Sequence, residues 1–394
     1  MKCTLWFRVA AVASVLGAGG PGGAAWAAEE KAEPTPGSIK VGCIFSVTGP
    51  AAYLGAPEKK TAEMLVEKIN AAGGVLGRKI QLIVKDSEGS PERATSFAHQ
   101  LIEEESVLAI IGPSTSGESL AIKNICQEGK TILLSCAAAE KITDPVAPYV
   151  FKSAPKDSYA AQWIYRTMKE LGIKRIGILA SNDGFGLAGR DQLVKYAPQN
   201  EIEIAASEVY DKATTDLTGA LNKLQGQNVQ AVVNWSIVPA QALVAKNMRQ
   251  LGFDVPLFQS HGFANIQYVR AGGAAANGTI FPAGRLLIAD LLPDNHPQKK
   301  LLMEYKKDYE ARYHEDASNF GGHAYDALTI LTAAIRNAGS TDREKVRDAI
   351  EKLQGFVGTA GIFNFSKEDH NGLDMTSFEM LTVKDGKFTF YKRN

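Results

Sequence analysis

Three consecutive hydroxyl residues, Ser114, Thr115 and Ser116, lie where they could bind an anion. Their segment, IIGPSTSGESLAIKNICQEGKTILLSCAAA (110–139), reads as a buried strand, a hydroxyl-rich turn, a helix and a second buried strand. The turn therefore falls at a helix N-terminus, where free N–H groups and the helix dipole favour negative charge. In open α/β sheets, ligands lie beyond the carboxyl ends of the strands. The segment predicts a carboxylate-binding pocket without an obvious catalytic group, although an ordinary helix cap would show the same residues.

The elements that would position this turn alternate between strand and helix along almost the whole chain. Near-continuous apolar runs are typical of parallel strands that are covered on both faces. Such runs lie at 39–47, 79–88, 107–112 and 131–137, and then at 149–155, 175–181, 203–210, 229–236, 256–262 and 278–284. Helices are expected between the strands, and residues 378–391 predict a β-hairpin around Asp385-Gly386. Two βα sets of similar design predict two α/β lobes with a cleft between them.

The N-terminus has the pattern of a secretory signal peptide. Basic residues precede a short stretch of small apolar residues, and Ala25-Trp26-Ala27 fits a cleavage site. We therefore expect an exported, periplasmic protein in which residues 1–27 are removed and residues 28–37 form a disordered lead-in. The apolar stretch is too short to anchor the chain in a membrane.

Charge and cysteine content exclude several classes of protein. The 394 residues include 43 basic and 43 acidic ones, with no basic patch that would indicate a nucleic-acid partner. Cys3 falls in the signal peptide, which leaves Cys43, Cys126 and Cys136. Their apolar surroundings favour buried thiols, while a bridge between Cys126 and Cys136 stays open. No cysteine or histidine spacing fits a metal site, so no metal is expected.

One motif could suggest an enzyme. GFGLAG (184–189) matches GxGxxG, follows a strand and opens a helix, as a dinucleotide site would. It lies in the second βα set rather than the first, and an exported protein rarely meets soluble NAD. We interpret it as a glycine-rich turn that packs a helix closely on its sheet, and we expect no enzyme and no cofactor. Among the histidines, His261 stands out because it follows a buried strand where the second lobe should face the cleft.

The sequence resembles the type I periplasmic solute-binding proteins of branched-chain amino acid-type ABC transporters, the Leu/Ile/Val-binding family. The matching segments cover nearly the whole mature chain in the family's order. They are IKVGCIFSVTGPAAYLG, KINAAGGVLGRKIQLIVKDSEGSPERA, IIGPSTS, YVFKSAPKDSYAA, SNDGFGLAG and FGGHAYDAL.

The resemblance implies two doubly wound, Rossmann-like lobes that are joined by three hinge crossovers and close on a ligand. The crossovers would lie near 153–156, 281–284 and 360–364. Lobe 1 would then comprise residues 38–155 and 285–360, and lobe 2 residues 156–284 and 361–394.

The family's ligand contacts can be carried over onto this sequence. In the family, a hydroxyl and backbone N–H groups of the first lobe hold an amino acid's carboxylate, and an acidic residue of the second lobe holds its ammonium group. The hydroxyl falls on Ser116, the second-lobe aromatic residue on Phe185, and the backbone segment on Ala137, Ala138 and Ala139. The walls are expected from Tyr53 and Leu54 in the first lobe and from Trp235 and Ile237 in the second.

Two positions depart from the family's pattern. Ala139 stands where a serine or threonine is usual, and His261 stands where the acidic partner of the ammonium group is usual. Because an unpartnered buried charge costs several kcal/mol, losing the acid should weaken amino acid binding greatly. His261 can instead donate to a carboxylate, a keto group or a phenol. We expect a carboxylate ligand without an α-ammonium group, such as an aromatic acid or a branched or aryl keto acid.

The sequence leaves other interpretations open. A hydrophobic amino acid, for example a branched-chain one, could still bind if a hidden acid such as Asp183 or Glu208 reached its ammonium group. The expected partner is an inner-membrane ABC permease that receives the ligand from a monomeric binding protein. A sensor that reports ligand occupancy to a membrane receptor would have the same sequence features.

Overall fold

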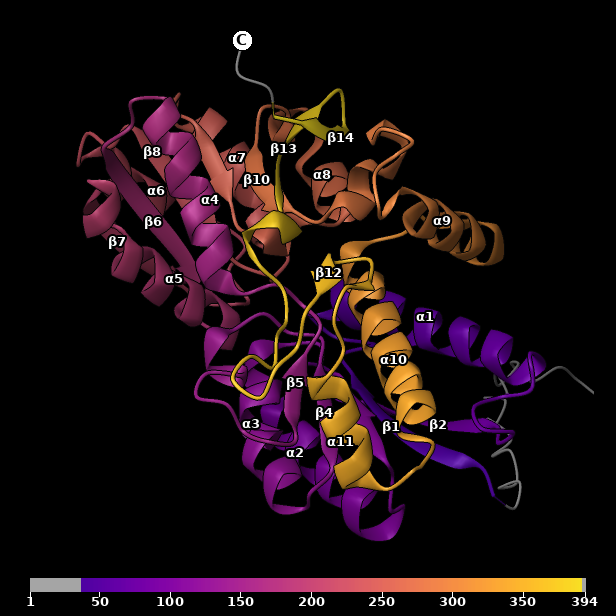
Figure 1. Ribbon diagram of the computed structural model, residues 1–394. Helices are drawn as coiled ribbons and strands as arrows, with labels where there is room; N and C mark the ends of the chain where they lie inside the picture. Colours follow the sequence, from indigo (N-terminus) through magenta and orange to yellow (C-terminus); the bar gives the residue numbers. More distant parts are fainter. Residues whose placement is uncertain (1–36, 392–394) are drawn as a thin grey trace, which may run out of the picture. The chain divides into compact units, whose positions relative to one another are not determined.

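The computed structural model describes residues 37–391 of the chain. The expected signal peptide (1–27) and all but the last residue of the expected lead-in (28–37) lie outside the described residues. Two main sheets, of five and seven strands, organise the fold, and helices flank each of them (Figure 1). We call the part built on the first sheet lobe 1 and the part built on the second sheet lobe 2. None of the helices within residues 37–391 has both the length and the apolar character that a transmembrane segment needs.

The sheet of lobe 1 is parallel throughout, in the order β2-β1-β3-β4-β5. Val41 and Cys43 of the first strand pack in one core cluster and Ile44 packs in another, so both faces of the sheet are covered. The strands are β1 (Ile39–Phe45), β2 (Ile80–Asp86), β3 (Ala109–Ile111), β4 (Ile132–Ser135) and β5 (Val150–Lys152).

Helices from both ends of the chain cover this sheet. Leu328 and Ile350, far along the sequence, share the core cluster of Val41 (Figure 1). The helices are α1 (Ala52–Ala71), α2 (Pro91–His99, continued by a π-helical turn at Gln100–Glu104), α3 (Ser116–Glu128), α10 (Asn319–Ala338) and α11 (Arg343–Glu351). The sequence therefore returns to its first sheet after building most of the second.

The sheet of lobe 2 has the order β14-β13-β10-β9-β8-β6-β7. Strands β6 to β10 are parallel, and a hairpin joins antiparallel to β10. The strands are β6 (Arg175–Ser181), β7 (Glu203–Tyr210), β8 (Ala231–Trp235), β9 (Leu257–Gln259), β10 (Ile280–Ala283), β13 (Glu379–Lys384) and β14 (Lys387–Phe390). Its helices are α4 (Asp157–Glu170), α5 (Gly184–Tyr196), α6 (Thr218–Gln225), α7 (Gln241–Gln250) and α8 (Ile266–Gly272).

The predicted alternation of strands and helices is confirmed, including the hairpin whose turn residues Asp385 and Gly386 both have positive φ. Helix α1 begins at Ala52, soon after β1 ends at Phe45. Gly55 explains this early start, because a Cβ there would lie 2.3 Å from the carbonyl group of Ser46. The first turn of α1 therefore packs directly on the chain that leaves β1, a contact that the apolar spacing does not reveal.

The connections between the lobes stay partly a prediction. Helix α9 (Lys299–Tyr313) packs with lobe 2 residues such as Leu381, yet the Tyr305 hydroxyl lies 2.7 Å from that of Thr61 on α1. A short hairpin of β11 (Phe356–Val357) and β12 (Ile362–Phe363) follows α11. Leu373 still packs in the core of lobe 1, whereas Phe378 packs in that of lobe 2. This packing favours a third crossover after Leu373, later than the 360–364 expected from the resemblance.

Candidate functional site

A small pocket lies where the two lobes meet, and most of the predicted site residues line it. We call it the binding pocket. Predicted residues in its lining are Leu54, Ser116, Ala137, Ala138, Phe185, Ile237 and His261. The other lining residues are Ser114, Thr115, Cys136, Ala154, Gly262, Phe320 and His323. Tyr53, Ala139 and Trp235, which were also predicted, do not line it.

The hydroxyl-rich turn presents one hydroxyl to a ligand rather than three. Ser114 Oγ accepts a hydrogen bond from the Ser46 N–H at 3.0 Å and donates to buried Glu58. Thr115 is the N-cap of α3, and its Oγ1 donates to Glu118 Oε2 at 2.6 Å in a capping box. Ser116 Oγ accepts from the Ala139 N–H at 3.2 Å, which leaves its own O–H proton for a further acceptor. Ser116 is therefore the hydroxyl that can bind a ligand carboxylate.

The three alanines after β4 have different environments. The Ala137 N–H donates to Ser135 Oγ at 3.1 Å, and the Ala139 N–H is the one held by Ser116. The Ala138 carbonyl accepts from Lys152 Nζ at 2.5 Å, behind the wall of the pocket. This arrangement leaves the N–H of Ala138 as the backbone donor of this segment that best faces a ligand. Ala139 is fully buried and acts through its bond to Ser116.

Aromatic rings form the wall of lobe 2. The ring of Phe185 lies 5.2 Å from the imidazole of His261, and Trp235 lies 5.6 Å from the same imidazole. Trp235 is fully buried behind these two residues and supports them instead of meeting the ligand. Tyr53 likewise packs 4.9 Å from the ring of Tyr268, outside the pocket. The predicted aromatic wall is thus formed by Phe185, with Phe320 of α10 as a residue that the sequence analysis missed.

The sequence analysis also missed a cluster of buried ionisable groups beside the pocket. Asp157, at the start of α4, is fully buried, and its Oδ1 lies 3.4 Å from Nε2 of His261. Burial raises the pKa of Asp157 to about 7 and lowers that of fully buried Lys152 to about 8. Burial, reinforced by nearby positive charge, lowers the pKa values of His261 and His323 to about 3. Both imidazoles are therefore neutral at physiological pH.

One signal in the sequence could have found Lys152. A lysine at the carboxyl end of the apolar run YVFK has no solvent beside it if the strand is central or covered. The two acids suggested as hidden ammonium partners lie elsewhere. Asp183 caps α5 by accepting from the N–H groups of Phe185 and Gly186, and Glu208 pairs with Lys223 at 2.8 Å.

The three cysteines of the described chain, Cys43, Cys126 and Cys136, are free and buried, as the apolar surroundings favoured. No cluster of three potential metal-binding side chains occurs within residues 37–391. The GFGLAG motif forms the first turns of α5, and a Cβ on Gly186 would lie 2.1 Å from the Ser181 carbonyl oxygen. Its glycines thus allow close packing of the helix on β6.

The buried imidazoles predict a specific loss of stability in acid. Between pH 6.5 and 3, His323 binds a proton in the unfolded chain but not in the folded one, so the free energy of unfolding falls as the pH falls. From pH 7 to pH 5, the free energy of unfolding should therefore fall by about 2 kcal/mol more in the wild type than in His323→Phe, which lacks the imidazole. Asp157 acts in the opposite direction, since its raised pKa favours the folded state as the pH falls below 7, but it is present in both proteins.

Urea unfolding of both proteins at the two pH values measures this difference. The control is His99→Phe on the exposed face of α2, which should follow the wild type. The same pH dependence in wild type and His323→Phe would contradict the assignment of a neutral, buried imidazole.

Comparisons with known proteins show which family the chain belongs to. The family profile described as "Periplasmic binding protein" matches residues 38–387. The chain is 25% identical, over 87% of its length and 90% of the relative, to the leucine-, isoleucine-, valine-, threonine-, and alanine-binding protein of Pseudomonas aeruginosa.

Solved structures of other binding proteins are also similar to this chain. An extracellular ligand-binding receptor from Rhodopseudomonas palustris HaA2 is 29% identical, with a TM-score of 0.84 over 90% of this chain and 99% of that one. The branched-chain amino acid transporter substrate-binding protein LivJ of Streptococcus pneumoniae, in complex with isoleucine, is 25% identical, with a TM-score of 0.77 over 89% and 97%. The chain therefore belongs to the periplasmic binding proteins, a family of exported solute-binding proteins that deliver small molecules to ABC transporter permeases and are not enzymes.

Proposed function

We propose that this solute-binding protein traps a small carboxylate that lacks an α-ammonium group, such as an aromatic acid or a branched or aryl keto acid. It would bind this ligand as a monomer in the periplasm and pass it to an inner-membrane permease. The observation that carries the proposal is the lining of the binding pocket, in which none of the described residues is acidic. His261 occupies the position of the usual acid, and burial keeps its imidazole neutral.

Donors at one end of the pocket support a carboxylate. Ser116, the first residue of α3, and Ala138 both line the pocket, so a hydroxyl at a helix N-terminus lies near a backbone N–H group without a partner among the described residues. Lys152 adds positive charge directly behind Ala138. Because Lys152 is fully buried, its charge is poorly screened by water and favours an anion nearby.

The rest of the pocket supports an apolar ligand body. Leu54 from lobe 1, Ile237 from lobe 2 and Phe320 from α10 contribute apolar side chains to the lining. Phe185 offers a ring edge or face for stacking. A flat aryl group or a branched alkyl group suits these walls better than a polar side chain does.

An amino acid remains the second candidate, because one observation favours it. Asp157 is a buried carboxyl group 3.4 Å from His261, and neither of its oxygens has a hydrogen-bond partner. An ammonium group could donate to the imidazole while Asp157 balances its charge from behind. Relatives such as the Pseudomonas aeruginosa protein are named as binding branched-chain amino acids. The ligand class thus depends on whether His261 replaces the usual acid or transmits the charge of Asp157.

Both candidates require the lobes to close, and the structure shows where they touch. A Cβ on Gly184, at the start of α5, would lie 2.6 Å from Cα and 2.7 Å from N of Gly117 at the start of α3. The two helix N-termini therefore meet backbone to backbone. This contact is possible only because Gly184 lacks a side chain, whereas a Cβ on Gly117 would lie 3.8 Å from its nearest neighbours.

Replacing His261 with glutamate should reverse the preference between two matched ligands. Phenylpyruvate and phenylalanine share a carbon skeleton and differ in the keto and ammonium groups. In His261→Glu, the affinity for phenylalanine should rise by about tenfold to a hundredfold, because a charged hydrogen bond is gained. The affinity for phenylpyruvate should fall, since the keto oxygen would face a carboxylate. Calorimetric titration of ligand-free protein measures both.

The control for this experiment is Ser116→Ala. It removes a hydroxyl that both ligands would use for their carboxylates, so it should weaken both by about tenfold to a hundredfold without changing their order. If His261→Glu lowered the affinities for phenylpyruvate and phenylalanine equally, the result would contradict the proposal. A wild-type protein that already prefers phenylalanine would support the amino acid candidate instead.

Adding a methyl group at the lobe contact should weaken ligand binding without unfolding the protein. Gly184→Ala places a Cβ against the backbone of Gly117, which the lobes can relieve only by separating. We expect the affinity for whichever of the two probes the wild type binds to fall by about tenfold or more. Gly219→Ala on α6 is the control, because no atom lies within 4 Å of a Cβ there. Unchanged affinity in Gly184→Ala would show that closure does not bring these helices together.

A further inference from the structure

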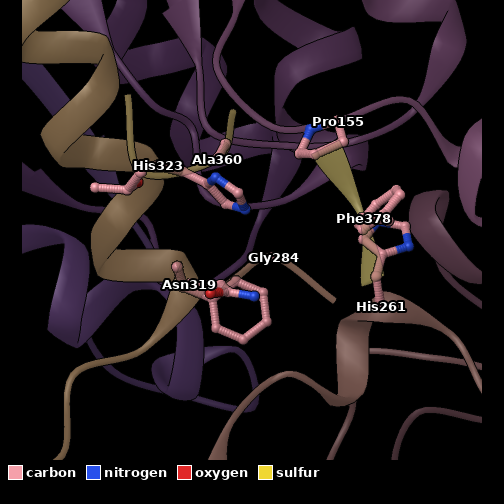
Figure 2. A pocket seen from close by; sticks show the side chains of 9 residues that line it. Pro155, His261, Gly284, Asn319, His323, Ala360 and Phe378 are labelled. Atoms are coloured by element: carbon pink, nitrogen blue, oxygen red, sulfur yellow. The ribbon is translucent and has the colours of Figure 1, made fainter. Parts of the chain in front are cut away.

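A second, small pocket lies next to the binding pocket, and we call it the hinge pocket. Its lining includes Pro155 after β5, Gly284 after β10 and Phe378 before β13, so it lies among the segments that connect the lobes (Figure 2). The full lining is Pro155, His261, Gly284, Asn319, Phe320, His323, Thr359, Ala360 and Phe378. His261, Phe320 and His323 line both pockets, so the two spaces share these side chains as a common wall.

The two imidazoles have unmet hydrogen-bonding capacity. His323 is 8% exposed, and its Nδ1 has no partner; His261 is 7% exposed, and neither of its ring nitrogens has one. Figure 2 shows the two rings approaching the hinge pocket from different sides, His323 from α10 and His261 from lobe 2. A buried polar group without a partner destabilises the folded state. We therefore expect these ring nitrogens to hydrogen-bond a ligand group or a water molecule.

The chemistry of the lining selects a neutral partner. A neutral imidazole offers one N–H donor and one nitrogen acceptor, which suits a hydroxyl or a carbonyl group. Thr359 Oγ1 donates to Asp326 Oδ2 at 3.0 Å, which leaves its lone pairs available as an acceptor. None of the nine lining residues is a lysine, an arginine or an acid, so a second charged group has no partner in the lining.

We propose that the hinge pocket is a second subsite, in which His323 hydrogen-bonds a hydroxyl or carbonyl group at the end of the ligand remote from its carboxylate. This inference rests on the proposed function, because it takes the carboxylate to lie at Ser116. The ligand body would pass between His261 and Phe320, where the rings can stack on it. The ligand is then an elongated aryl carboxylate with a polar group in the para position, rather than a short branched acid.

A series of acids of increasing length tests this subsite. Benzoate, phenylacetate and 3-phenylpropionate are titrated by calorimetry into ligand-free wild-type protein, each with and without a 4-hydroxyl group. At the length that reaches the hinge pocket, the hydroxyl should raise the affinity by about threefold to tenfold, the effect of one neutral hydrogen bond. At a length that does not reach it, the hydroxyl should give no gain.

The variant His323→Phe then tests whether His323 is the residue that hydrogen-bonds the 4-hydroxyl group. Within this variant, each acid should bind equally well with and without its 4-hydroxyl group, whatever affinity change the two acids share, because the partner of the hydroxyl is gone. His323→Leu is a second variant with a smaller side chain, and His99→Phe on exposed α2 is the control that should keep the gain.

The outcomes separate the inference from the proposed function. If the acids bind but the hydroxyl gives no gain at any length, or if the gain survives in both His323 variants, the second subsite is wrong and the proposed function stands. If none of the acids binds while phenylalanine or leucine does, the proposed function fails and the inference fails with it. Only one outcome supports the second subsite, namely that the affinity gained from the 4-hydroxyl group is lost in both His323 variants.

Discussion

A charge that is buried without a partner destabilises a protein by several kcal/mol, and this constraint decides what the binding pocket can hold. Ser116 and Ala138 supply hydrogen-bond donors to the pocket, and the Lys152 ammonium group is bonded to the Ala138 carbonyl. His261 lines the same pocket, and burial keeps its imidazole neutral. A ligand that is anionic at one end and uncharged at the other leaves no charge unpaired. A zwitterion would depend on Asp157, which reaches the pocket only through His261.

The parallel sheets bring these groups together. Ser116 follows β3, the alanine segment follows β4 and Lys152 ends β5, so all three lie at the carboxyl edge of one sheet. His261 follows β9 at the corresponding edge of the other sheet. The lobes then meet at Gly117 and Gly184, where the absence of a side chain on Gly184 lets two helix N-termini touch. The site is thus built mainly from strand ends that face one another, with Leu54 of α1 and two residues of α10 completing the lining.

The strands could be predicted from the sequence, and so could the positions of residues that directly follow a strand. β6 and β7 have their predicted bounds, and Ser116, Phe185 and His261 are among the residues that line the pocket. The sequence was insufficient where tertiary contacts decide the environment. Trp235 ends a predicted strand but is fully buried beside Phe185, outside the pocket lining, because both faces of β8 are covered.

Residues distant in sequence were missed for the same reason. His323 and Phe320 lie on a helix that returns to lobe 1 after most of lobe 2 is built, and no local pattern indicates that α10 reaches the pocket. Asp157 looks like an ordinary acidic residue in the first turn of a helix. Its importance appears only when burial removes its solvent and places it beside His261.

The most direct test of this account compares wild-type protein with two pairs of matched ligands. Calorimetric titration of ligand-stripped protein would measure the dissociation constants of phenylpyruvate against phenylalanine and of 4-methyl-2-oxopentanoate against leucine. The account predicts that the keto acid binds more tightly in any pair that binds, by about tenfold or more, because the ammonium group finds no acid in the pocket lining. Tighter binding of the amino acids would contradict it and would make Asp157 the charge that the ligand uses.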